Sequence, residues 1–398
     1  MHYIRLLRPA KFDATNPEKP FISVLIAITT DLGDAFLQPV EPVKLLVPVD
    51  GPVDPSISME TETRPPAWRG NKRILEIKAP LKPHTKKEAV TCTLKIHPQM
   101  QPQPLGTLNS GYFFLDPPDT YGLIMPVTVK MTKGVCSSVC VRTLELDTGP
   151  KPEHEFVVDF EEDIGESIAR HIWDAGLVTA SYLAEACQTR MKIREVLPIS
   201  SESFSVLELG SGVGILGITL ACILERAAEV QGQALHGATV LLTDLPEAEE
   251  RARSNIARAK STLLDRSEGD PVVDLQYENL DWDDGKRGRF GPLASARAWD
   301  LVVLSDCTYN ADSQPALVGT LSAVHAAGTR HHGPAHTTET QVLLATKPRH
   351  DSEDALFHVL TAAGWAYRLL ARVPLPRIGD DAPEEVQLWA LRKDNNVE

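Results

Sequence analysis

The sequence predicts an α/β protein in which a smaller β-rich region precedes a mostly parallel sheet of seven strands. From about residue 205 onward, apolar runs typical of strands alternate with amphipathic helical stretches. Within Ser205–Leu220, a glycine-rich turn joins a short apolar strand to an apolar helix. Before residue 150, short β-branched runs are separated by proline, glycine and aspartate. We therefore predict two domains, 1–150 and 151–398, which also fits a chain of 398 residues.

The N-terminal region reads as a series of short strands separated by turns. We expect strands at Phe21–Thr29, Val43–Val49, Arg73–Lys78, Val90–His97, Gly111–Leu115 and Val127–Met131. Short strands with regularly spaced turn signals are typical of a small β-sandwich or barrel. No group of catalytic residue types is found in this region.

A bridging segment leads to the second domain. The acidic run Asp159–Asp163 follows a short strand, and we expect it to be a solvated loop or a helix N-terminus. A helix with one buried face is predicted to begin near Trp173.

From Ser205 the alternation of strands and helices sets the architecture. Strands are expected at Val206–Leu209, Thr239–Thr243, Val272–Tyr277, Leu301–Leu304, Val342–Thr346, Ala366–Val373 and Val386–Leu391. Helices are expected at Gly214–Ala228, Glu247–Lys260, Gln314–Ala327 and Ser352–Ala363. In such a sheet the carboxyl ends of the parallel strands lie along one edge, where ligands bind.

The glycine-rich turn is the clearest candidate binding element. Glycine has no Cβ, so backbone N–H groups can approach a ligand closely. The run from Gly212 to Gly217 also matches the GxGxxG pattern of dinucleotide sites. Asp244 ends the second strand of the alternating region, where it can accept ribose hydroxyls of either kind of ligand. These features alone leave the ligand open.

Two further features favour S-adenosylmethionine over a dinucleotide. Glu208 precedes Gly210, and a carboxylate there suits a ligand with hydroxyls and a positive charge better than a pyrophosphate. Asp306 and Tyr309 follow the fourth strand, where the acid would face the methyl acceptor and the tyrosine would line its channel. The alternative for Asp306 is an N-cap of the helix that follows. No residue set resembles a hydride-transfer site, which argues against a NAD-dependent oxidoreductase.

From about Trp173 onward, the chain resembles the family-16 seven-β-strand methyltransferases, the group that includes methyltransferase-like 21 protein-lysine methyltransferases. The matching segments are IWDAG at 172–176, VLELGSGVGILGI at 206–218, TDLPEA at 243–248, LDW at 280–282, DLVVLSDCTY at 300–309 and LLATKPRH at 343–350. The resemblance implies a Rossmann-like class I methyltransferase fold, S-adenosylmethionine as cofactor and a protein lysine as acceptor. The first 150 residues lie outside it.

The resemblance also assigns roles to residues at the matching positions. It implies that Trp173 contacts the cofactor, that Gly210, Ser211 and Gly212 approach its methionine part, that Asp244 takes the ribose hydroxyls, that Trp282 flanks the adenine and that Ser305 lies beside the ligand. From the residues alone, Trp282 is better explained as a core or loop side chain, although an aromatic residue on the loop after the third strand can also stack on a purine. Trp173 fits either a core side chain or one that lines a pocket.

Net charge, hydropathy and cysteine spacing indicate which classes of partner the protein has: nucleic acid, membrane, metal or protein. A net charge of −14 argues against a general nucleic-acid binder and is compatible with a basic protein substrate. No long apolar run or signal-peptide core is found, so we expect no membrane span and a cytoplasmic or nuclear monomer. Cys136 and Cys140 form a CxxxC motif that has no second cysteine pair, and the histidines of segment 328–340 lie in an expected loop. We therefore expect no metal site.

Two alternatives to protein-lysine methylation stay open. The acceptor is a small amine or an arginine in the first. In the second, the methyltransferase fold is inactive and the β-rich region is an interaction module. Neither the substrate protein nor the degree of methylation follows from the sequence.

Overall fold

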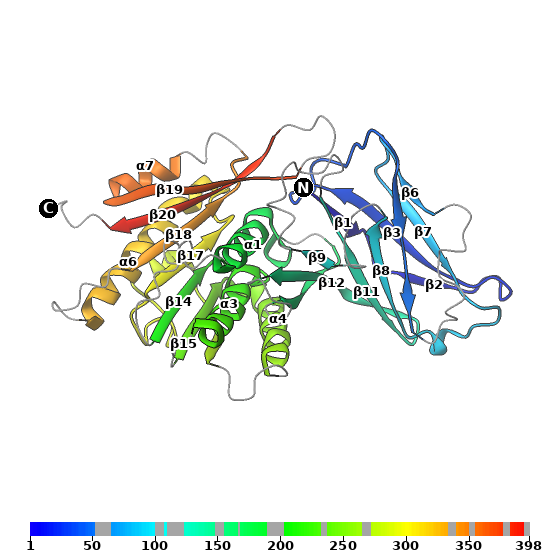
Figure 1. Cartoon of the computed structure of the whole chain (residues 1–398), viewed down its shortest axis with the longest axis horizontal. Coiled ribbons are helices and arrows are strands. Elements are labelled where there is room, and N and C mark those ends of the chain that lie inside the picture. Colours follow the sequence, from blue (N-terminus) through cyan, green and yellow to red (C-terminus); the bar gives the residue numbers. More distant parts are fainter. Residues whose placement is uncertain are drawn as a thin grey trace. The chain divides into compact units, whose positions relative to one another are not determined.

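The computed structural model describes residues 1–51, 65–99, 107–109, 123–147, 155–165, 168–188, 203–231, 237–264, 272–332, 340–349, 355–376 and 383–393. The chain divides into two compact units (Figure 1). The first comprises Met1–Glu145, Asp159–His171 and Leu375–Pro383, and the second comprises Leu146–Val158, Ile172–Pro374 and Glu384–Glu398. The division at residues 150 and 151 stays a prediction about domains that fold independently.

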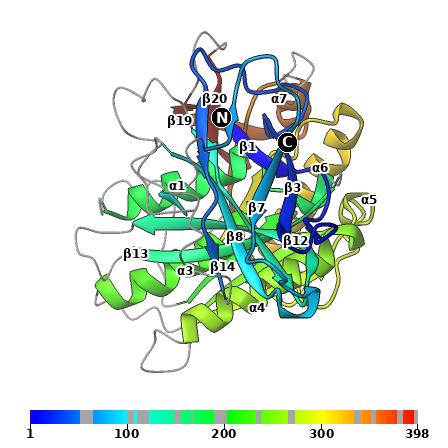
Figure 2. The ribbon, with the colours of Figure 1, turned by 90° about the vertical axis from the view of Figure 1, so that its right-hand side faces the viewer.

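The first unit is built almost entirely from strands, several of which face the viewer in Figure 2. They are β1 (His2–Leu6), β2 (Lys11–Asp13), β3 (Phe21–Thr29), β4 (Val43–Leu46), β5 (Val49–Asp50), β6 (Ala67–Trp68), β7 (Leu75–Pro80), β8 (Cys92–Pro98), β9 (Thr107–Asn109), β10 (Ile124–Met125), β11 (Val127–Thr132), β12 (Val135–Asp147) and β13 (Glu155–Asp163). The end of β12 and the start of β13 fall in the range Leu146–Val158, which is grouped with the second unit. A β-rich N-terminal region is thereby confirmed. The expected strand Val43–Val49 is divided into β4 and β5, and Gly111–Leu115 lies outside the described residues.

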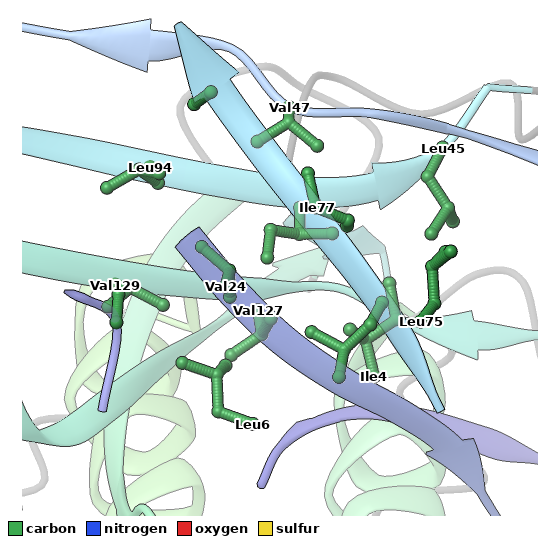
Figure 3. Packing of buried hydrophobic residues seen from close by; sticks show 14 of the residues in the cluster. Ile4, Leu6, Val24, Leu45, Val47, Leu75, Ile77, Leu94, Val127 and Val129 are labelled. Atoms are coloured by element: carbon green, nitrogen blue, oxygen red, sulfur yellow. The ribbon is translucent and has the colours of Figure 1, made fainter. Parts of the chain in front are cut away.

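The strands of this unit form one 13-stranded sheet that follows the path β10-β1-β3-β2-β12-β11-β8-β4-β6. Apolar side chains fill the space where its strands cross. Val24 of β3 and Ile77 of β7 point toward the same interior as Leu94 of β8 and Val127 of β11 (Figure 3). Alternate residues of β7 are buried and exposed, as expected for a strand with one face on the core.

One buried ion pair in this unit corrects an expectation from the sequence. The acidic run Asp159–Asp163 is neither a solvated loop nor a helix end, because it belongs to strand β13. Glu162 is buried and accepts a hydrogen bond from Arg142 Nε at 2.6 Å. Burial alone would raise the pKa of Glu162, but Arg142 and His171 hold it below its ordinary value. A partner on β12, which pairs with β13, therefore makes a buried acid tolerable here.

The second unit contains the predicted alternation of strands and helices. Its strands are β14 (Ser203–Leu209), β15 (Gly237–Asp244), β16 (Val273–Asn279), β17 (Leu301–Ser305), β18 (Gln341–Thr346), β19 (Trp365–Pro374) and β20 (Glu385–Lys393). Its α-helices are α1 (Asp174–Gln188), α3 (Ile215–Gln231), α4 (Pro246–Leu264), α5 (Trp282–Gly285), α6 (Gln314–His332) and α7 (Ala355–Ala362). None of the helices in the described part of the chain combines the length and hydropathy that a membrane crossing needs.

The strands pair in the order β16-β15-β14-β17-β18-β20-β19. All neighbours from β16 to β18 are parallel, whereas β20 is antiparallel to both β18 and β19. Helices α1, α3 and α4 form one contacting group and α5, α6 and α7 another, with the central strands between them (Figure 1). The central strands are buried along nearly their whole length, which is expected for a sheet covered on both faces. The predicted seven-stranded class I methyltransferase architecture is confirmed.

Candidate cofactor and methyl-acceptor site

The site lies at the point where the order of successive strands in the sheet reverses. Strands β15 and β16 follow β14 on one side, and β17 and β18 lie on the other. The loops after β14 and β17 are therefore neighbours at the carboxyl edge, where doubly wound sheets bind ligands.

The turn after β14 adopts conformations that only glycine tolerates easily. Gly210, Gly212 and Gly214 have φ values of 70°, 53° and 87°. A Cβ on Gly210 would lie 2.5 Å from Cys307 Sγ, so a side chain there has no room. The N–H groups of Gly210 and Ser211 donate to the carbonyl of Thr243 at 2.9 and 3.0 Å, which ties the turn to β15.

Glu208 lies beneath this turn. Glu208 is only 1% exposed, and its Oε2 accepts a hydrogen bond from the N–H of Gly217 at 3.0 Å. Burial raises the pKa of Glu208 well above its ordinary value, against the opposing effect of the Gly217 hydrogen bond, and Asp244 raises it further. Glu208 thus supports the turn from below, and its direct contact with a ligand stays a prediction.

Asp244 lies at the end of β15 beside the same turn. Its carboxylate accepts from the N–H of Gly212 and from the N–H of Leu245, each at 2.7 Å. Burial raises the pKa of Asp244, although these two hydrogen bonds oppose the shift. The structure therefore brings Asp244 to the glycine turn, as the ribose-binding prediction requires.

Two residues of the turn and its surroundings suit a ligand. Ser211 is only 6% exposed, and its buried hydroxyl has no hydrogen-bond partner among the described residues. Trp282 begins α5, and its Cζ2 would lie 3.2 Å from a Cβ on Gly210. A half-buried indole next to the turn is placed where a purine can stack.

Trp173 and Ser305 lie around the start of α1. Ser305 is half-buried at the end of β17, and its Oγ would lie 3.2 Å from a Cβ on Gly176. Trp173 is also half-buried, and Arg349 Cζ lies 5.7 Å from the centroid of its ring. Both therefore come to the carboxyl edge, and their contacts with a cofactor stay predictions.

Asp306 follows β17 in a left-handed backbone conformation, with φ at 52°. Its Oδ2 accepts from the N–H of Ala175 at 2.7 Å, and Arg349 Nη1 lies 2.7 Å from its Oδ1. The expected alternative, an N-cap of the following helix, is wrong in detail. Asn310 accepts from the N–H of Asp312 there, at 3.1 Å, while Asp306 binds the first turn of α1.

Tyr309 lies three residues further on and is 56% exposed. Partial burial raises the pKa of its phenol, as do Cys307 and Asp244. The side chain is thus accessible at the same edge as Asp306, and its part in an acceptor channel stays a prediction.

The sequence reasoning missed two cations after β18. Arg349 holds Asp306, and Lys347 Nζ lies 2.8 Å from Asp174 Oδ2 and 3.0 Å from Glu384 Oε2. The sequence does show these two basic residues, Lys347 and Arg349, just after a predicted strand. Their partners, however, are far away in sequence, so pairing could not be inferred from spacing.

The residues present fit S-adenosylmethionine. The turn leaves no room for a Cβ at Gly210, Ser211 offers a buried hydroxyl with no partner in the described chain, and Asp244 offers a carboxylate next to backbone N–H groups. Trp282 adds an aromatic surface. This donor set matches a ligand with hydroxyls, a purine and a cationic centre.

The chain is similar to several known proteins. A family model described as lysine methyltransferase matches residues 152–363. A UPF0665 family protein of Schizosaccharomyces pombe is 30% identical over 195 residues, which is 49% of this chain and 47% of that protein. The protein N-terminal and lysine N-methyltransferase EFM7 of Cryptococcus neoformans is 24% identical over 208 residues, or 50% of this chain and 60% of that protein. The matches thus span about half the length of these curated relatives.

Among solved structures, P. horikoshii TYW2 in complex with MeSAdo is 12% identical and covers 67% of this chain and 75% of its own, with a TM-score of 0.34. A TM-score this low does not establish likeness of the whole fold. The family model, in contrast, matches more than half of the chain and includes the turn, Asp244, Trp282 and Asp306. The protein therefore belongs to the lysine methyltransferase family, as its motifs predict, and its cofactor is S-adenosylmethionine.

Proposed function

We propose that the chain transfers the methyl group of S-adenosylmethionine to the ε-amine of a lysine in a protein substrate. The observation that supports this best is the placement of Asp306 and Tyr309 beside the glycine turn, at the neighbouring strand ends of β14 and β17. The printed name of the Cryptococcus relative, which includes lysine and N-terminal methylation, favours the same chemistry.

Each residue of the site has a role in this proposal. Gly210, Ser211 and Gly212 lie against the methionine part of the cofactor, while Asp244 takes the ribose hydroxyls. Trp282 flanks the adenine, and Trp173 and Ser305 lie beside the ligand. Glu208 keeps the turn in place through Gly217.

The cofactor, when bound, supplies a methyl group activated by the adjacent sulfonium. The protein then has mainly to align a neutral amine with that methyl group and to keep water away. Asp306 orients the amine and Tyr309 shapes its path. No dedicated general base is assigned, so the amine loses its proton to solvent before it reacts.

The proposal is tested by incubating the full-length chain with methyl-labelled cofactor and cell extract, and then separating labelled protein from labelled small molecules. We expect label in protein, recovered as methyl-lysine after acid hydrolysis. Label confined to small molecules would favour the small-amine alternative, and label in methyl-arginine would favour the arginine alternative.

Asp306→Ala gives the matching residue test. We expect transfer to fall by at least about a hundredfold because the amine is no longer oriented, while cofactor binding measured by calorimetry is largely kept. Transfer by the variant at the wild-type rate would contradict the assigned role. A wild-type chain that neither binds cofactor nor labels any substrate would instead favour an inactive binding protein. The monomeric state of this protein and its cytoplasmic or nuclear location stay predictions.

A further inference from the structure

The turn between β11 and β12 brings together lysines from three separate parts of the first unit. The N–H of Gly134 in this turn donates to the carbonyl of Val90 at 2.8 Å, which fixes the turn against the segment before β8. A Cβ on Gly134 would clash with the Lys87 side chain, so the stem of Lys87 lies directly against the turn. Lys11 of β2 lies opposite Val135, the first residue of β12. The lysine patch consists of the four exposed side chains of Lys11, Lys86, Lys87 and Lys133.

Lys133 has an unusual backbone conformation for its residue type. Thr132 pairs with Val135, so Lys133 and Gly134 form a two-residue hairpin turn. Their φ values are 51° and 68°, as in a type I′ turn, where asparagine followed by glycine is the favoured pair. The left-handed region disfavours a residue with a Cβ such as lysine. Strain of this kind at an exposed position is typical of residues whose side chain has a function.

The charges of the lysine patch are not balanced by the part of the chain that the structure describes. None of the four lysines forms an ion pair with a described residue. Lys78, in contrast, is an exposed lysine of the same unit, and its Nζ lies 3.8 Å from Glu76 Oε2. Glu88 and Asp13 are close to the patch in sequence, but neither pairs with its lysines. The patch therefore offers ammonium groups to a partner.

The distribution of charge along the chain limits what that partner is. Residues 1–145 contain 17 lysines and arginines and 14 acids, whereas residues 146–398 contain 23 and 40. The first stretch thus has a net charge of +3 and the second a net charge of −17. A long polyanion, such as a nucleic acid or an anionic membrane, would meet repulsion from the second stretch. A short acidic segment can contact the patch alone.

The side chains of the patch also favour a protein over a nucleic acid. Lysine presents a point charge and does not make the bidentate phosphate contacts of arginine. The apolar residue beside Lys11 is Val135, which is 61% exposed, and an aliphatic side chain does not offer bases a stacking surface. Val135 can instead be covered by an apolar side chain of a peptide.

We propose that the lysine patch is a docking surface for an acidic segment of a partner protein, whose carboxylates pair with the lysines while an apolar side chain covers Val135. In the proposed function, on which this second step rests, the partner is the methyl acceptor. Docking raises the local concentration of the acceptor at the transfer site, because the patch and that site belong to one chain. The acidic segment is then separate from the lysine that is methylated.

The first test is binding of a fluorescein-labelled peptide in which pairs of glutamates alternate with leucine. The full-length chain is titrated into the peptide at low salt, and binding is followed by fluorescence anisotropy. The patch variant combines Lys86→Gln, Lys87→Gln and Lys133→Asn. Glutamine keeps the stem that packs on Gly134, and asparagine suits the left-handed turn. Thermal melting should therefore show no loss of stability.

The matched control combines Lys44→Gln, Lys260→Gln and Arg368→Gln, which removes the same charge from exposed positions outside the patch. Wild type and control should bind the peptide equally, with an affinity that falls as salt is added. The patch variant should bind at least about fivefold more weakly, because several exposed ion pairs are lost. Lys133→Asn alone should weaken binding while it keeps or raises the melting temperature, so that result stays decisive even if the triple variant does not fold.

The second test uses the extract protein that the wild-type chain labels most strongly, purified before use. The patch variant should raise the KM for this acceptor by about the same factor as the peptide Kd and leave kcat unchanged, because the patch lies outside the transfer site. The control should change neither constant.

Peptide binding by the patch variant at wild-type strength, or an equal loss in patch variant and control, would overturn the docking surface. Tighter binding of a thymidylate oligonucleotide, or of phosphatidylserine vesicles, than of the peptide would overturn the choice of a protein partner. Lost peptide binding with an unchanged KM would show that the partner is not the methyl acceptor. A chain that labels no protein removes the proposed function, whereas the peptide titration needs no transfer and still decides whether the patch binds acids.

Discussion

Glu208 illustrates how one buried carboxyl can hold a glycine-rich turn in place through the backbone. It accepts a hydrogen bond from the N–H of Gly217 below the turn, and a Cβ on Gly217 would clash with its Oε2. The absence of a side chain at Gly217 is therefore what allows the carboxyl to reach the backbone. The sequence indicated an acid at this position but not the direction it faces. Strand β14 is buried on both faces, so its pattern contains no alternation from which a direction could be read.

The raised pKa of Glu208 predicts a specific dependence of stability on pH. A carboxyl whose pKa is higher in the folded state contributes stability below its unfolded pKa and loses that contribution as the pH rises through the folded pKa. Each unit of difference is worth about 1.4 kcal/mol. Glu208→Gln keeps an acceptor for Gly217 but cannot ionise. We therefore expect the free energy of unfolding of wild type to fall more between pH 5 and pH 8 than that of Glu208→Gln.

Urea denaturation of the full-length chain at the two pH values measures this difference. Glu250→Gln, which changes an exposed glutamate of α4, is the matched control and should behave like wild type. Parallel changes in wild type and Glu208→Gln would show that Glu208 is not the group responsible.

At the scale of elements, the loop after β18 ties the start of α1 to the sheet. Lys347 is 2% exposed and pairs with Asp174, the first residue of α1, while Arg349 pairs with Asp306, which in turn binds the second residue of α1. The two ion pairs thus fix the start of α1 next to Trp173 and Asp306. Neither pair was predictable from spacing, because Lys347 and Asp174 are 173 residues apart and Arg349 and Asp306 are 43 apart.

Lys347→Met should be strongly destabilising for this reason. It leaves the Asp174 carboxylate buried without its ammonium partner, which typically costs about 3–5 kcal/mol. The double variant Lys347→Met with Asp174→Asn should recover part of the loss, since no buried charge is left unpaired. Lys393→Met is the control: this partly buried lysine bonds to Ser322 and Ala363 rather than to an acid. Urea denaturation that gives equal losses for Lys347→Met and Lys393→Met would contradict the argument.

Elements with a strong apolar pattern were predicted more closely than those held by polar partners. Strand β3 coincides with the expected Phe21–Thr29, because a nine-residue β-branched run leaves little choice. For Asp159–Asp163, in strand β13, the sequence predicts a solvated loop or a helix N-terminus, because the acids are not apolar and Arg142, the partner of Glu162, comes from the preceding strand. Periodicity detects burial by hydrophobic residues, and it misses burial made possible by a distant charge.

At the scale of the whole molecule, the two units are interleaved along the sequence. The family model begins at residue 152, yet Asp159–His171 belongs to the first compact unit rather than to the second. Leu375–Pro383 also belongs to the first unit, although β19 and β20 on either side are strands of the second unit's sheet. The boundary between the two compact units is therefore not a single point near residue 150, while the division into domains 1–150 and 151–398 stays a prediction.

A fragment of residues 151–398 tests this interleaving. The fragment keeps β13 and Glu162 but lacks β12 and Arg142, so the strand loses its neighbour and the acid loses its partner. Such a segment should open readily, because little holds it in place. We expect trypsin to cut after Arg170 at least about tenfold faster in the fragment than in the full-length chain. Cleavage after Lys286, a residue of the second unit, is the internal reference and should be equally fast in both proteins. Equal rates after Arg170 in the two proteins would show that residues 159–171 are held without the N-terminal strands, and the division at residue 150 would then describe the domains better than the interleaved units do.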